Sequence, residues 1–384
     1  MTKKKILFLI NSLTTGGAER VITTLLAHST AEREEFDIVF ALLDDVARAY
    51  EPAPWLKVRQ LDCRESMVRS ILSVRALVRE ERPDLVLSFL TRANIAAALA
   101  CKERAIPCIL SERINNSAHL PHNMGGAAAR LFIRGAYPLA ARIIAVSSGV
   151  EEDLRANFGI AAEKVVVIDN PVDGAAIAAK AEAAPQLGVE APYIIAAGRL
   201  TKVKNFALLI EAYAAAKVAS KLVIIGEGAE REALERQIEA LGLAGRVLLP
   251  GHMDNPYPLM QRAALYVSPS NAEGFPNALV EAMALGRPVV SSNCRSGPAE
   301  ILAETTRDAV EGLSFARHGV LFPVGSAECL AAALQAMEDP ALRARYAEAA
   351  VLRARDFSVE RSKDRYWDVI RKELARRDER AHAR

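Results

Sequence analysis

One segment decides the fold, LYVSPSNAEGFPNALVE at residues 265–281. Its first residues, Leu265–Val267, form a short apolar run that predicts a buried strand, and Ser268-Pro269-Ser270 is a turn sequence. Pro276 then suits the first turn of a helix. A strand that leads through a short loop into a helix is the repeating unit of a parallel α/β sheet. The segment therefore predicts an α/β protein.

The same alternation extends outward from this segment. In the second half of the chain, further apolar runs predict strands at 193–197, 222–225, 247–249 and 289–291. In the first half they predict strands at 6–10, 38–42, 85–89, 109–110, 143–146 and 165–168, with helical patterns at 19–27, 67–79 and 150–157. Continuous apolar strands separated by helices indicate parallel sheets covered on both faces. We therefore predict two doubly wound, Rossmann-like domains that face each other across a cleft.

A break in the alternation marks the domain boundary. Residues 170–174, Asn-Pro-Val-Asp-Gly, are a turn cluster, and an alanine-rich stretch follows as far as Pro185 and Gly188. A chain of 384 residues is also too long for one ordinary core. We predict an N-terminal domain at 1–172, a linker at 173–190, a C-terminal domain at 191–357, and a helix at 358–384 that packs back on the N-terminal domain.

The composition excludes several classes of protein. With 51% hydrophobic and 25% charged residues the chain is globular, and a net charge of +2 gives no reason to expect nucleic acid as a partner. No segment has the eighteen or so apolar residues that span a bilayer, and the run Ile6–Ile10 is too short for a signal peptide. Five cysteines without a Cys-x-x-Cys spacing fit neither disulfides nor zinc. We expect a cytoplasmic protein whose membrane contact is peripheral.

Two glutamates in the opening segment are candidate ligand-binding residues. Glu273 and Gly274 follow the carboxyl end of a strand, where open α/β sheets bind ligands. Glu281 lies about one turn inside the next helix, whose first N–H groups and dipole favour a phosphate or a sugar oxygen. Carboxylates at two levels can bind hydroxyls at both ends of an extended ligand, such as a hexose and a ribose. The alternative is a solvated helix with two ordinary glutamates.

A second candidate site is the segment at residues 198–205, Gly-Arg-Leu-Thr-Lys-Val-Lys-Asn, which also joins a predicted strand to a helix. Loss of a nucleoside diphosphate places charge on its phosphate oxygens, and cations held there lower the barrier. Arg199 suits this task by its bidentate geometry and Lys204 as a point charge. Removing either should raise the barrier by roughly 2–4 kcal/mol. The alternative is a turn with solvated charges.

Glycines mark two further loops. Gly16 and Gly17 join the first strand to the first helix, in a loop whose backbone N–H groups can meet a phosphate. This loop lacks the Gly-x-Gly-x-x-Gly spacing of a dinucleotide site, so a nicotinamide oxidoreductase is disfavoured. Residues 226–228, Gly-Glu-Gly, are interpreted as a turn.

Taken together, residues 16–20 (Gly-Gly-Ala-Glu-Arg), the 198–205 segment, the 226–228 turn and the Glu273-x7-Glu281 pair resemble the family 4 retaining glycosyltransferases of GT-B fold. The resemblance runs from the first strand to about Phe357. It implies that Glu281 binds the donor ribose, that Glu273 binds hydroxyls of the transferred sugar, and that Gly16 and Gly17 approach the donor phosphates. It also implies that Arg199 and Lys204 hold the diphosphate, together with backbone of Gly274, Phe275, Pro276 and Asn277.

The resemblance implies no cofactor and no catalytic metal, with a UDP-sugar as donor substrate and same-face attack assisted by the leaving phosphate. The chain has no convincing Asp-x-Asp motif, since Asp44 and Asp45 are adjacent. One position departs from the family pattern. Many relatives carry a histidine after the strand that ends here at Leu110, and Arg113 occupies that place. Arg113 could meet a phosphate or sugar oxygen but cannot act as a base; His119 is the alternative.

A local surplus of basic residues in the first half of the chain bears on the kind of acceptor. Residues 57–142 hold fourteen Lys and Arg against seven Asp and Glu, which can attract an anionic surface. For any single arginine a solvated helix face is the simpler explanation. Collectively they suit an enzyme on the cytoplasmic face of the inner membrane with a polyprenyl-diphosphate-linked acceptor, as in the bacterial lipid-linked oligosaccharide N-acetylhexosaminyltransferases that the chain resembles. The arginines assigned to this side are Arg64, Arg69, Arg130 and Arg134, with His119 nearby.

Several functions remain open on this evidence. The first is transfer of an N-acetylhexosamine from a UDP-sugar to a polyprenyl-diphosphate-linked saccharide. A glycosyltransferase with a non-lipid acceptor, and a nucleotide-sugar epimerase or hydrolase of the same fold, are the alternatives, because fold does not fix function. A non-catalytic module that binds nucleotide sugars is a further possibility.

Overall fold

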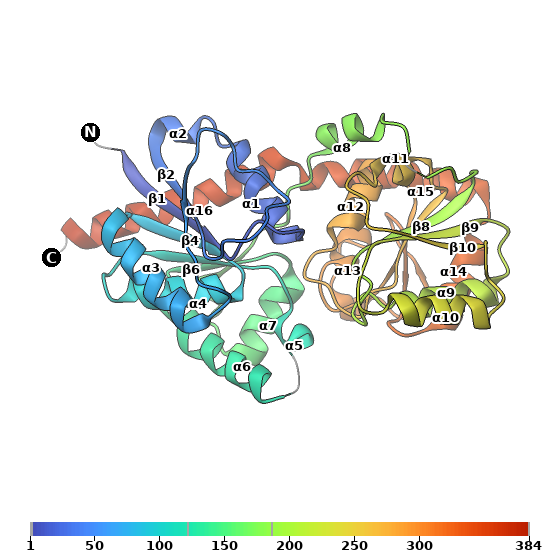
Figure 1. Ribbon diagram of the computed structural model, residues 1–384, viewed down its shortest axis with the longest axis horizontal. Coiled ribbons are helices and arrows are strands. Elements are labelled where there is room, and N and C mark those ends of the chain that lie inside the picture. The colour runs from blue at the N-terminus through green and yellow to red at the C-terminus, as the bar shows by residue number, and fades with distance from the viewer. Residues whose placement is uncertain (1–2, 121–122, 186, 383–384) are drawn as a thin grey trace. The chain divides into compact units, whose positions relative to one another are not determined.

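The computed structural model describes residues 3–120, 123–185 and 187–382, and it divides the chain into two compact units (Figure 1). The first unit comprises Met1–Pro171 together with Val359–Arg384, and the second comprises Val172–Ser358. Each unit contains a sheet of seven strands covered by helices. This is the α/β class with two Rossmann-like sheets that the sequence predicts.

The sheet of the first unit has the order β3-β2-β1-β4-β5-β6-β7, and all neighbouring strands are parallel. Its strands are β1 (Lys4–Ile10), β2 (Phe36–Leu42), β3 (Lys57–Gln60), β4 (Leu85–Phe89), β5 (Cys108–Glu112), β6 (Arg142–Ala145) and β7 (Val165–Val167). Its helices are α1 (Gly17–Ala27), α2 (Glu32–Glu35), α3 (Met67–Glu81), α4 (Thr91–Lys102), α5 (Asn116–His119), α6 (Met124–Ala136), α7 (Ser148–Phe158) and α16 (Val359–His382).

The sheet of the second unit has the order β10-β9-β8-β11-β12-β14-β13, with only the edge strand β13 antiparallel to its neighbour. Its strands are β8 (Tyr193–Ala197), β9 (Lys221–Ile225), β10 (Val247–Gly251), β11 (Leu265–Ser268), β12 (Val289–Ser292), β13 (Ser314–Phe315) and β14 (Val320–Phe322). Its helices are α8 (Gly174–Ala181), α9 (Phe206–Ala216), α10 (Arg231–Ala240), α11 (Tyr257–Arg262), α12 (Asn277–Ala284), α13 (Pro298–Leu302), α14 (Ala327–Ala336) and α15 (Pro340–Ala354).

The prediction of a linker at 173–190 is wrong for the first half of this range. Residues Gly174–Ala181 form α8, which packs against α11 and α12 within the second unit. Asp173 caps this helix, since its side chain accepts a hydrogen bond from the N–H of Ala176. Ile177 and Ala181 are buried on one side of the helix. An alanine-rich sequence looks like a connector in composition, but alanine also favours a helix, and two apolar residues a turn apart are enough to dock it.

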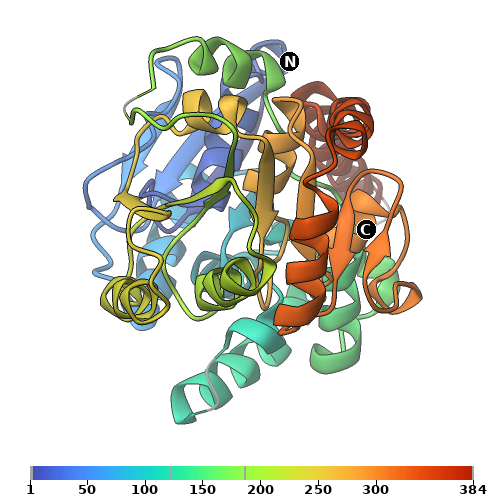
Figure 2. The same cartoon turned by 90° about the vertical axis from the view of Figure 1, so that its right-hand side faces the viewer.

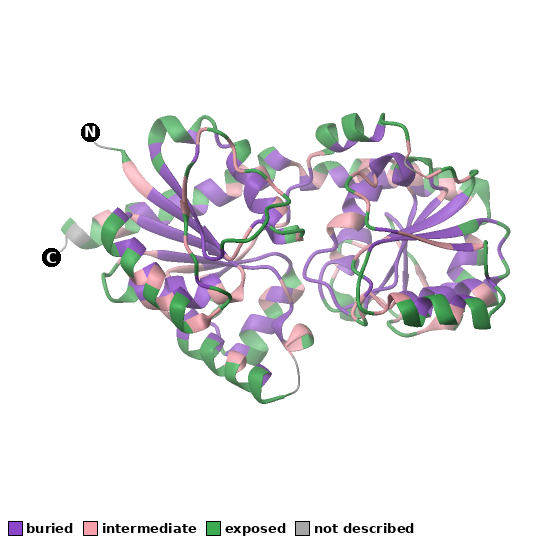
Figure 3. Cartoon of the chain, in the orientation of Figure 1, coloured by how far each residue is buried: buried purple, intermediate pink, exposed green. Residues whose placement is uncertain are grey.

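The cores lie between the sheets and their helices. Figure 3 shows the central strands of both sheets buried and the outward faces of the helices exposed. In β1, residues Ile6–Ile10 are fully buried, which is expected for a central parallel strand covered on both faces. Residues 383–384 and the other undescribed positions aside, no helix is both long enough and apolar enough to cross a bilayer.

Helix α16 contributes a large aromatic anchor to the first unit. Trp367 is fully buried, stacks on Phe36 at 5.2 Å between ring centroids, and meets Phe8 edge-on at 5.8 Å. Its indole N–H donates to the Ser29 hydroxyl at 2.9 Å, so its polar atom is satisfied as well. The final helix of the chain is thus part of the core formed by β1 and β2, although more than three hundred residues separate them in sequence.

We predict that Trp367→Ala lowers the free energy of unfolding by about 3–5 kcal/mol, because it removes a buried ring and leaves a cavity. Urea denaturation followed by circular dichroism measures the change. Leu72→Ala is the control in the same unit, since Leu72 is 57% exposed, and it should change stability by less than about 0.5 kcal/mol. A Trp367→Ala protein as stable as this control would show that α16 is dispensable for the first unit.

Candidate functional site

Two loops of the second unit meet where its strand order reverses. One follows β8 (residues 198–205) and the other follows β11 (residues 269–276), and these two strands are neighbours in the sheet. The chain leaves β8 toward one edge of the sheet and β11 toward the other. In open α/β sheets, ligands bind in the crevice outside the carboxyl ends of the strands at such a point. Both loops carry residues that the sequence selects as a candidate site.

Asn271 ties the two loops together. Its backbone N–H donates to the carbonyl of Val203 at 2.7 Å, and its side-chain amide donates to the carbonyl of Lys202 at 2.9 Å. The same side chain accepts a hydrogen bond from the amide of Asn205 at 3.0 Å. Three hydrogen bonds therefore hold the loop after β8 in register with the loop after β11.

Glu273 and Lys204 form an ion pair across these loops. Lys204 Nζ donates to Glu273 Oε1 at 2.7 Å, and the hydroxyl of Ser270 donates to the same oxygen at 2.6 Å. Glu273 is only 8% exposed, so its charge is compensated by charge-assisted hydrogen bonds rather than by water. The sequence assigns these two residues to different parts of a ligand, and the structure places them in direct contact.

Glu281 stands on the following helix, α12, and is also buried. The hydroxyl of Tyr257 donates to its Oε2 at 3.5 Å. The pKa of Tyr266 is affected by both carboxylates. Burial raises the pKa of its phenol, and the negative charges of Glu273 and Glu281 raise that pKa further. The two glutamates therefore act on one small region beside β11, which keeps the Tyr266 phenol protonated.

Arg199 completes the charged set of the crevice. Its side chain is exposed, and its guanidinium makes no ion pair or hydrogen bond with the residues that the structure describes. Lys204 has three donor positions, of which one points to Glu273. Both cations can therefore offer hydrogen bonds to an anion. Phe275, Pro276 and Gly274 line the start of α12 as buried residues, and Asn277 is half-buried; Phe275 is fixed edge-on against Phe357 at 5.4 Å.

The glycines at 226 and 228 are more than the turn that the sequence predicts. They follow β9 and pass so close to the loop after β8 that a Cβ on Gly226 would lie 1.9 Å from the carbonyl oxygen of Gly198. A Cβ on Gly228 would lie 2.3 Å from the carbonyl oxygen of Leu200. The N–H of Leu200 donates to the carbonyl of Glu227 at 2.8 Å. Only glycine permits this approach, which positions the backbone beside Arg199.

Cys294 lies buried near the same carboxylate. Burial and the negative charge of Glu273 raise the pKa of its thiol to about 12. The thiol is therefore protonated at neutral pH. In the part of the chain that the structure covers, no three His, Cys, Asp or Glu side chains gather as metal ligands would.

Close packing explains why residue 16, in the loop after β1, is a glycine. A Cβ on Gly16 would lie 2.1 Å from Oε2 of Glu19, so the buried Glu19 side chain folds back over the start of α1. Gly17 is exposed as the first residue of that helix, and Arg20 is half-buried. A role of Gly16 and Gly17 toward donor phosphates remains a prediction.

Arg113 is held by several side chains of the first unit, and a role toward a ligand remains a prediction. Arg113 is 6% exposed, and its guanidinium donates to the Tyr366 hydroxyl at 2.7 Å, to Ser111 at 3.2 Å and to Asn170. It also lies over the Phe89 ring at 5.5 Å. Arginine can bridge several buried acceptors, and here it joins Tyr366 of α16 to Ser111 at the end of β5. His119 is half-buried, with Nδ1 2.9 Å from the carbonyl of Asn115.

The arginines assigned to the acceptor side differ in their surroundings. Arg69 is exposed on α3, and Arg64 is exposed beside Asp62, with Nε and Oδ2 3.1 Å apart. On α6, Arg130 donates to the carbonyl of Leu120 at 3.3 Å, and Arg134 donates to the carbonyl of Asn157 at 2.9 Å. Arg64, Arg69 and Arg134 are exposed on the first unit, and Arg130 is half-buried.

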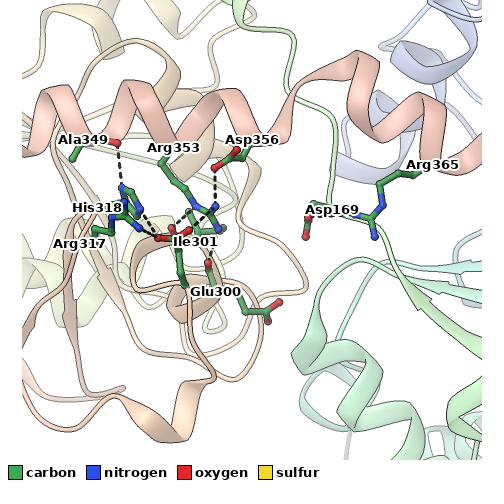
Figure 4. A network of polar contacts seen from close by, with 10 residues as sticks. Asp169, Glu300, Ile301, Arg317, His318, Ala349, Arg353, Asp356 and Arg365 are labelled. Atoms are coloured by element: carbon green, nitrogen blue, oxygen red, sulfur yellow. Dashed lines mark hydrogen bonds and ion pairs between the residues drawn. The ribbon is translucent and has the colours of Figure 1, made fainter.

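The second unit also has a separate hollow of about 260 Å³. It is lined by a cluster of ion-paired side chains, whose polar contacts are drawn in Figure 4. Glu304 accepts hydrogen bonds from Arg317 at 2.6 Å and Arg353 at 3.4 Å, and lies 3.1 Å from Nε2 of His318. His318 precedes β14, so the hollow lies at the amino end of that strand, opposite the edge that carries Glu273. Its charges compensate one another and hold α15 in place.

The architecture is that of GT-B glycosyltransferases, which pair two Rossmann-like sheets. The crystal structure of Anabaena HepE in complex with UDP is similar in fold, with a TM-score of 0.74 and 23% identity over 96% of this chain and all of that one. Sucrose-phosphate synthase from Thermosynechococcus elongatus is also similar in fold, with a TM-score of 0.76 and 17% identity over 97% of this chain and all of that one.

Sequence comparison fixes the family. Residues 15–175 match Glycosyltransferase Family 4, and residues 179–353 match Glycosyl transferases group 1. N-acetylgalactosamine-N,N'-diacetylbacillosaminyl-diphospho-undecaprenol 4-alpha-N-acetylgalactosaminyltransferase of Campylobacter jejuni is 31% identical, over 92% of this chain and 96% of its own. The chain belongs to the family 4, group 1 glycosyltransferases, and it is a glycosyltransferase.

Sequence reasoning missed the residues that organise this crevice. The sequence marks Ser270 only as part of a turn, and it does not mark Asn271 or Tyr257 as candidate residues. The signal for Ser270 was its place three residues before Glu273, in the same turn. Nothing in the sequence shows that Asn271 bonds residues almost seventy positions away.

We predict that Gly226→Ala lowers the free energy of unfolding of the second unit by about 1–3 kcal/mol, because the new methyl group would overlap the Gly198 carbonyl. Gly174→Ala is the control, since a Cβ there has no atom within 4 Å. Guanidinium denaturation compares the two variants. Equal stability of the two variants would contradict the prediction, because it would mean that the loop after β8 moves away from the new methyl group with no loss of free energy.

Proposed function

We propose that this glycosyltransferase is a retaining, metal-independent enzyme that transfers an N-acetylhexosamine from a UDP-sugar to a polyprenyl-diphosphate-linked saccharide. The observation that carries the donor part is the crevice of the second unit, where Lys204 and Glu273 are paired beside Arg199 and Glu281. It offers two cations for a diphosphate and two carboxylates for hydroxyl groups. UDP in the HepE complex supports the choice of nucleotide.

In this proposal the charges divide between the parts of the donor. Arg199 and Lys204 bind the diphosphate and stabilise the charge that develops as UDP leaves, a role for which preorganised cations in a crevice are effective. Glu281 accepts hydrogen bonds from ribose hydroxyls, and Glu273 accepts them from the transferred sugar. The start of α12, with Gly274 and Phe275, adds its dipole to the phosphate side. These groups supply the positive charge that a metal supplies in other transferases.

The acceptor is proposed from relatives. The Campylobacter jejuni relative is named for an undecaprenyl-diphosphate-linked acceptor and for transfer of N-acetylgalactosamine. A second relative from that organism, a GalNAc-alpha-(1->4)-GalNAc-alpha-(1->3)-diNAcBac-PP-undecaprenol alpha-1,4-N-acetyl-D-galactosaminyltransferase, is 23% identical over 95% of this chain and 98% of its own. We therefore place this chain's acceptor in the same chemical class, a saccharide on a polyprenyl diphosphate.

The proposal is tested by incubating the protein with a panel of UDP-sugars, with and without a polyprenyl-diphosphate-linked saccharide. Sugar transfer that requires the acceptor supports it, and the anomeric configuration of the product tests retention. Transfer unchanged by EDTA supports metal independence. Release of UDP or epimerisation of the sugar without any acceptor would favour the epimerase or hydrolase alternative.

We predict that Glu273→Ala nearly abolishes turnover while UDP still binds, and that Glu281→Ala weakens UDP binding by roughly tenfold, as expected for a lost hydrogen bond to a charged group. Calorimetry with UDP and an assay of sugar transfer separate the two effects. Glu311→Ala, at an exposed position, is the control. Equal losses of UDP affinity at 273 and 281 would contradict the assigned roles.

Membrane association is proposed from one face of the first unit. Helix α6 packs against α4 and α7, and its ribbon projects from the rest of the first unit at the lower left of Figure 2. It exposes Met124 at 90%, Leu131 at 73% and Phe132 at 47%. Helix α3, which also packs against α4, exposes Val68 and Leu72. Apolar side chains beside exposed arginines suit an amphipathic helix lying in an anionic membrane interface. We propose that this surface contacts the leaflet that holds the acceptor.

We predict that Leu131→Glu lowers binding to liposomes containing anionic phospholipid about tenfold or more, because a large apolar side chain is lost from the contact. Sedimentation with liposomes measures the bound fraction, and higher salt should weaken it further through screening. Leu352→Glu is the control, since Leu352 is 62% exposed but lies in the second unit. Binding that both variants lose equally, or that salt leaves unchanged, would exclude this surface.

A further inference from the structure

Glu273 is held by only one of its two carboxylate oxygens. Lys204 Nζ and the Ser270 hydroxyl both donate to Oε1, at 2.7 Å and 2.6 Å. Oε2 receives no hydrogen bond from the residues that the structure describes. Because two donors converge on one oxygen, the plane of the carboxylate is fixed and the second oxygen is left to accept from another molecule.

The two donors differ in how firmly they hold the carboxylate. Lys204 has a long side chain, 27% exposed, and in the proposed function its charge is also drawn to the diphosphate of the donor. Ser270 is 2% exposed on a short side chain and carries no charge that a phosphate attracts. When a diphosphate competes for Lys204, Ser270 remains as the fixed donor to Oε1. A neutral donor also leaves the negative charge of Glu273 available to a sugar hydroxyl.

Ser270 is itself fixed from the neighbouring strand. The hydroxyl of Ser292, at the end of β12, donates to the backbone carbonyl of Ser270, and Ser292 is fully buried. A chain of hydrogen bonds therefore runs from β12 through the Ser270 backbone to the carboxylate. Buried residues whose rotamers are set by such contacts keep a functional group within the narrow geometry that a reaction needs.

We propose that Ser270 is the positioning residue for Glu273, and that it presents Oε2 of that carboxylate to a hydroxyl of the transferred sugar. The inference rests on the proposed function. Ser270 touches no substrate in this arrangement and acts only through Glu273. Its loss should therefore lower the rate of sugar transfer much more than it lowers the affinity for UDP.

The experiment compares Ser270→Ala with Ser291→Ala. Ser291 is a matched control because it is also a fully buried serine beside β11, and its hydroxyl donates to the Ser292 carbonyl at 3.2 Å instead of to a carboxylate. Calorimetry with UDP gives the affinity, and sugar transfer from UDP-N-acetylgalactosamine gives kcat and donor KM. We expect kcat of Ser270→Ala to fall roughly 10- to 100-fold, as for a lost hydrogen bond to a charged group. Its UDP affinity should stay within about twofold, and Ser291→Ala should resemble the wild type.

A double-mutant cycle then asks whether Ser270 acts through Glu273. With enzyme in excess over donor, Ser270→Ala should cost nothing more in a Glu273→Gln background, since the residue that it positions is already altered. Equal and additive losses would overturn the inference, as would a Ser270→Ala enzyme as active as Ser291→Ala. A wild-type protein that binds no UDP would instead overturn the proposed function, and that result is visible before any variant is made.

Discussion

The ion pair between Lys204 and Glu273 is the contact on which the crevice of the second unit depends. It joins the loop after β8 to the loop after β11, and these are the two loops at which the strand order of the second sheet reverses. A carboxylate as buried as Glu273 is costly unless its charge is compensated, and removing one partner of such a pair costs more than the pair contributes. Each residue therefore stabilises the other in its place, and in the proposed function both side chains also contact the donor.

Close contacts between loop backbones, together with hydrogen bonds of Asn271, place Lys204 within bonding distance of Glu273. Gly226 and Gly228 let the loop after β9 lie against the loop after β8. Asn271 then bonds the latter to the loop after β11 at three points. Each loop is anchored at a strand end, so the site rests on the most rigid elements of the unit. A consequence is visible in Tyr266 and Cys294, whose pKa values are raised by burial and by the carboxylates nearby.

The sequence predicted the central strands because they are buried on both faces and form unbroken apolar runs, as Tyr193–Ala197 does. It did not predict β3, Lys57–Gln60, because this edge strand is half-exposed and carries three polar residues. The site glutamates were recognisable from their place after a strand, whereas the partners of Arg113 were not. Tyr366 lies more than 250 positions away, and only the folded chain shows that Arg113 faces it. The local sequence pattern thus predicts the strands, helices and loops. Which charged side chains are exposed depends on contacts between segments that are distant in sequence.

The distribution of charge in the crevice accounts for how one small site can bind a ligand with unlike parts. Arg199 and Lys204 oppose Glu273 and Glu281, so the four side chains are neutral in sum, and an isolated anion gains little from them as a group. A nucleotide sugar does gain, because its anionic and hydroxyl-bearing parts are separated in space and each meets groups of the matching kind. In the proposed function, phosphate oxygens accept hydrogen bonds from the two cations, and ribose and hexose hydroxyls donate to the two carboxylates. In that function, UDP would therefore meet the two cations and Glu281, and the sugar of the complete donor would add the contact with Glu273.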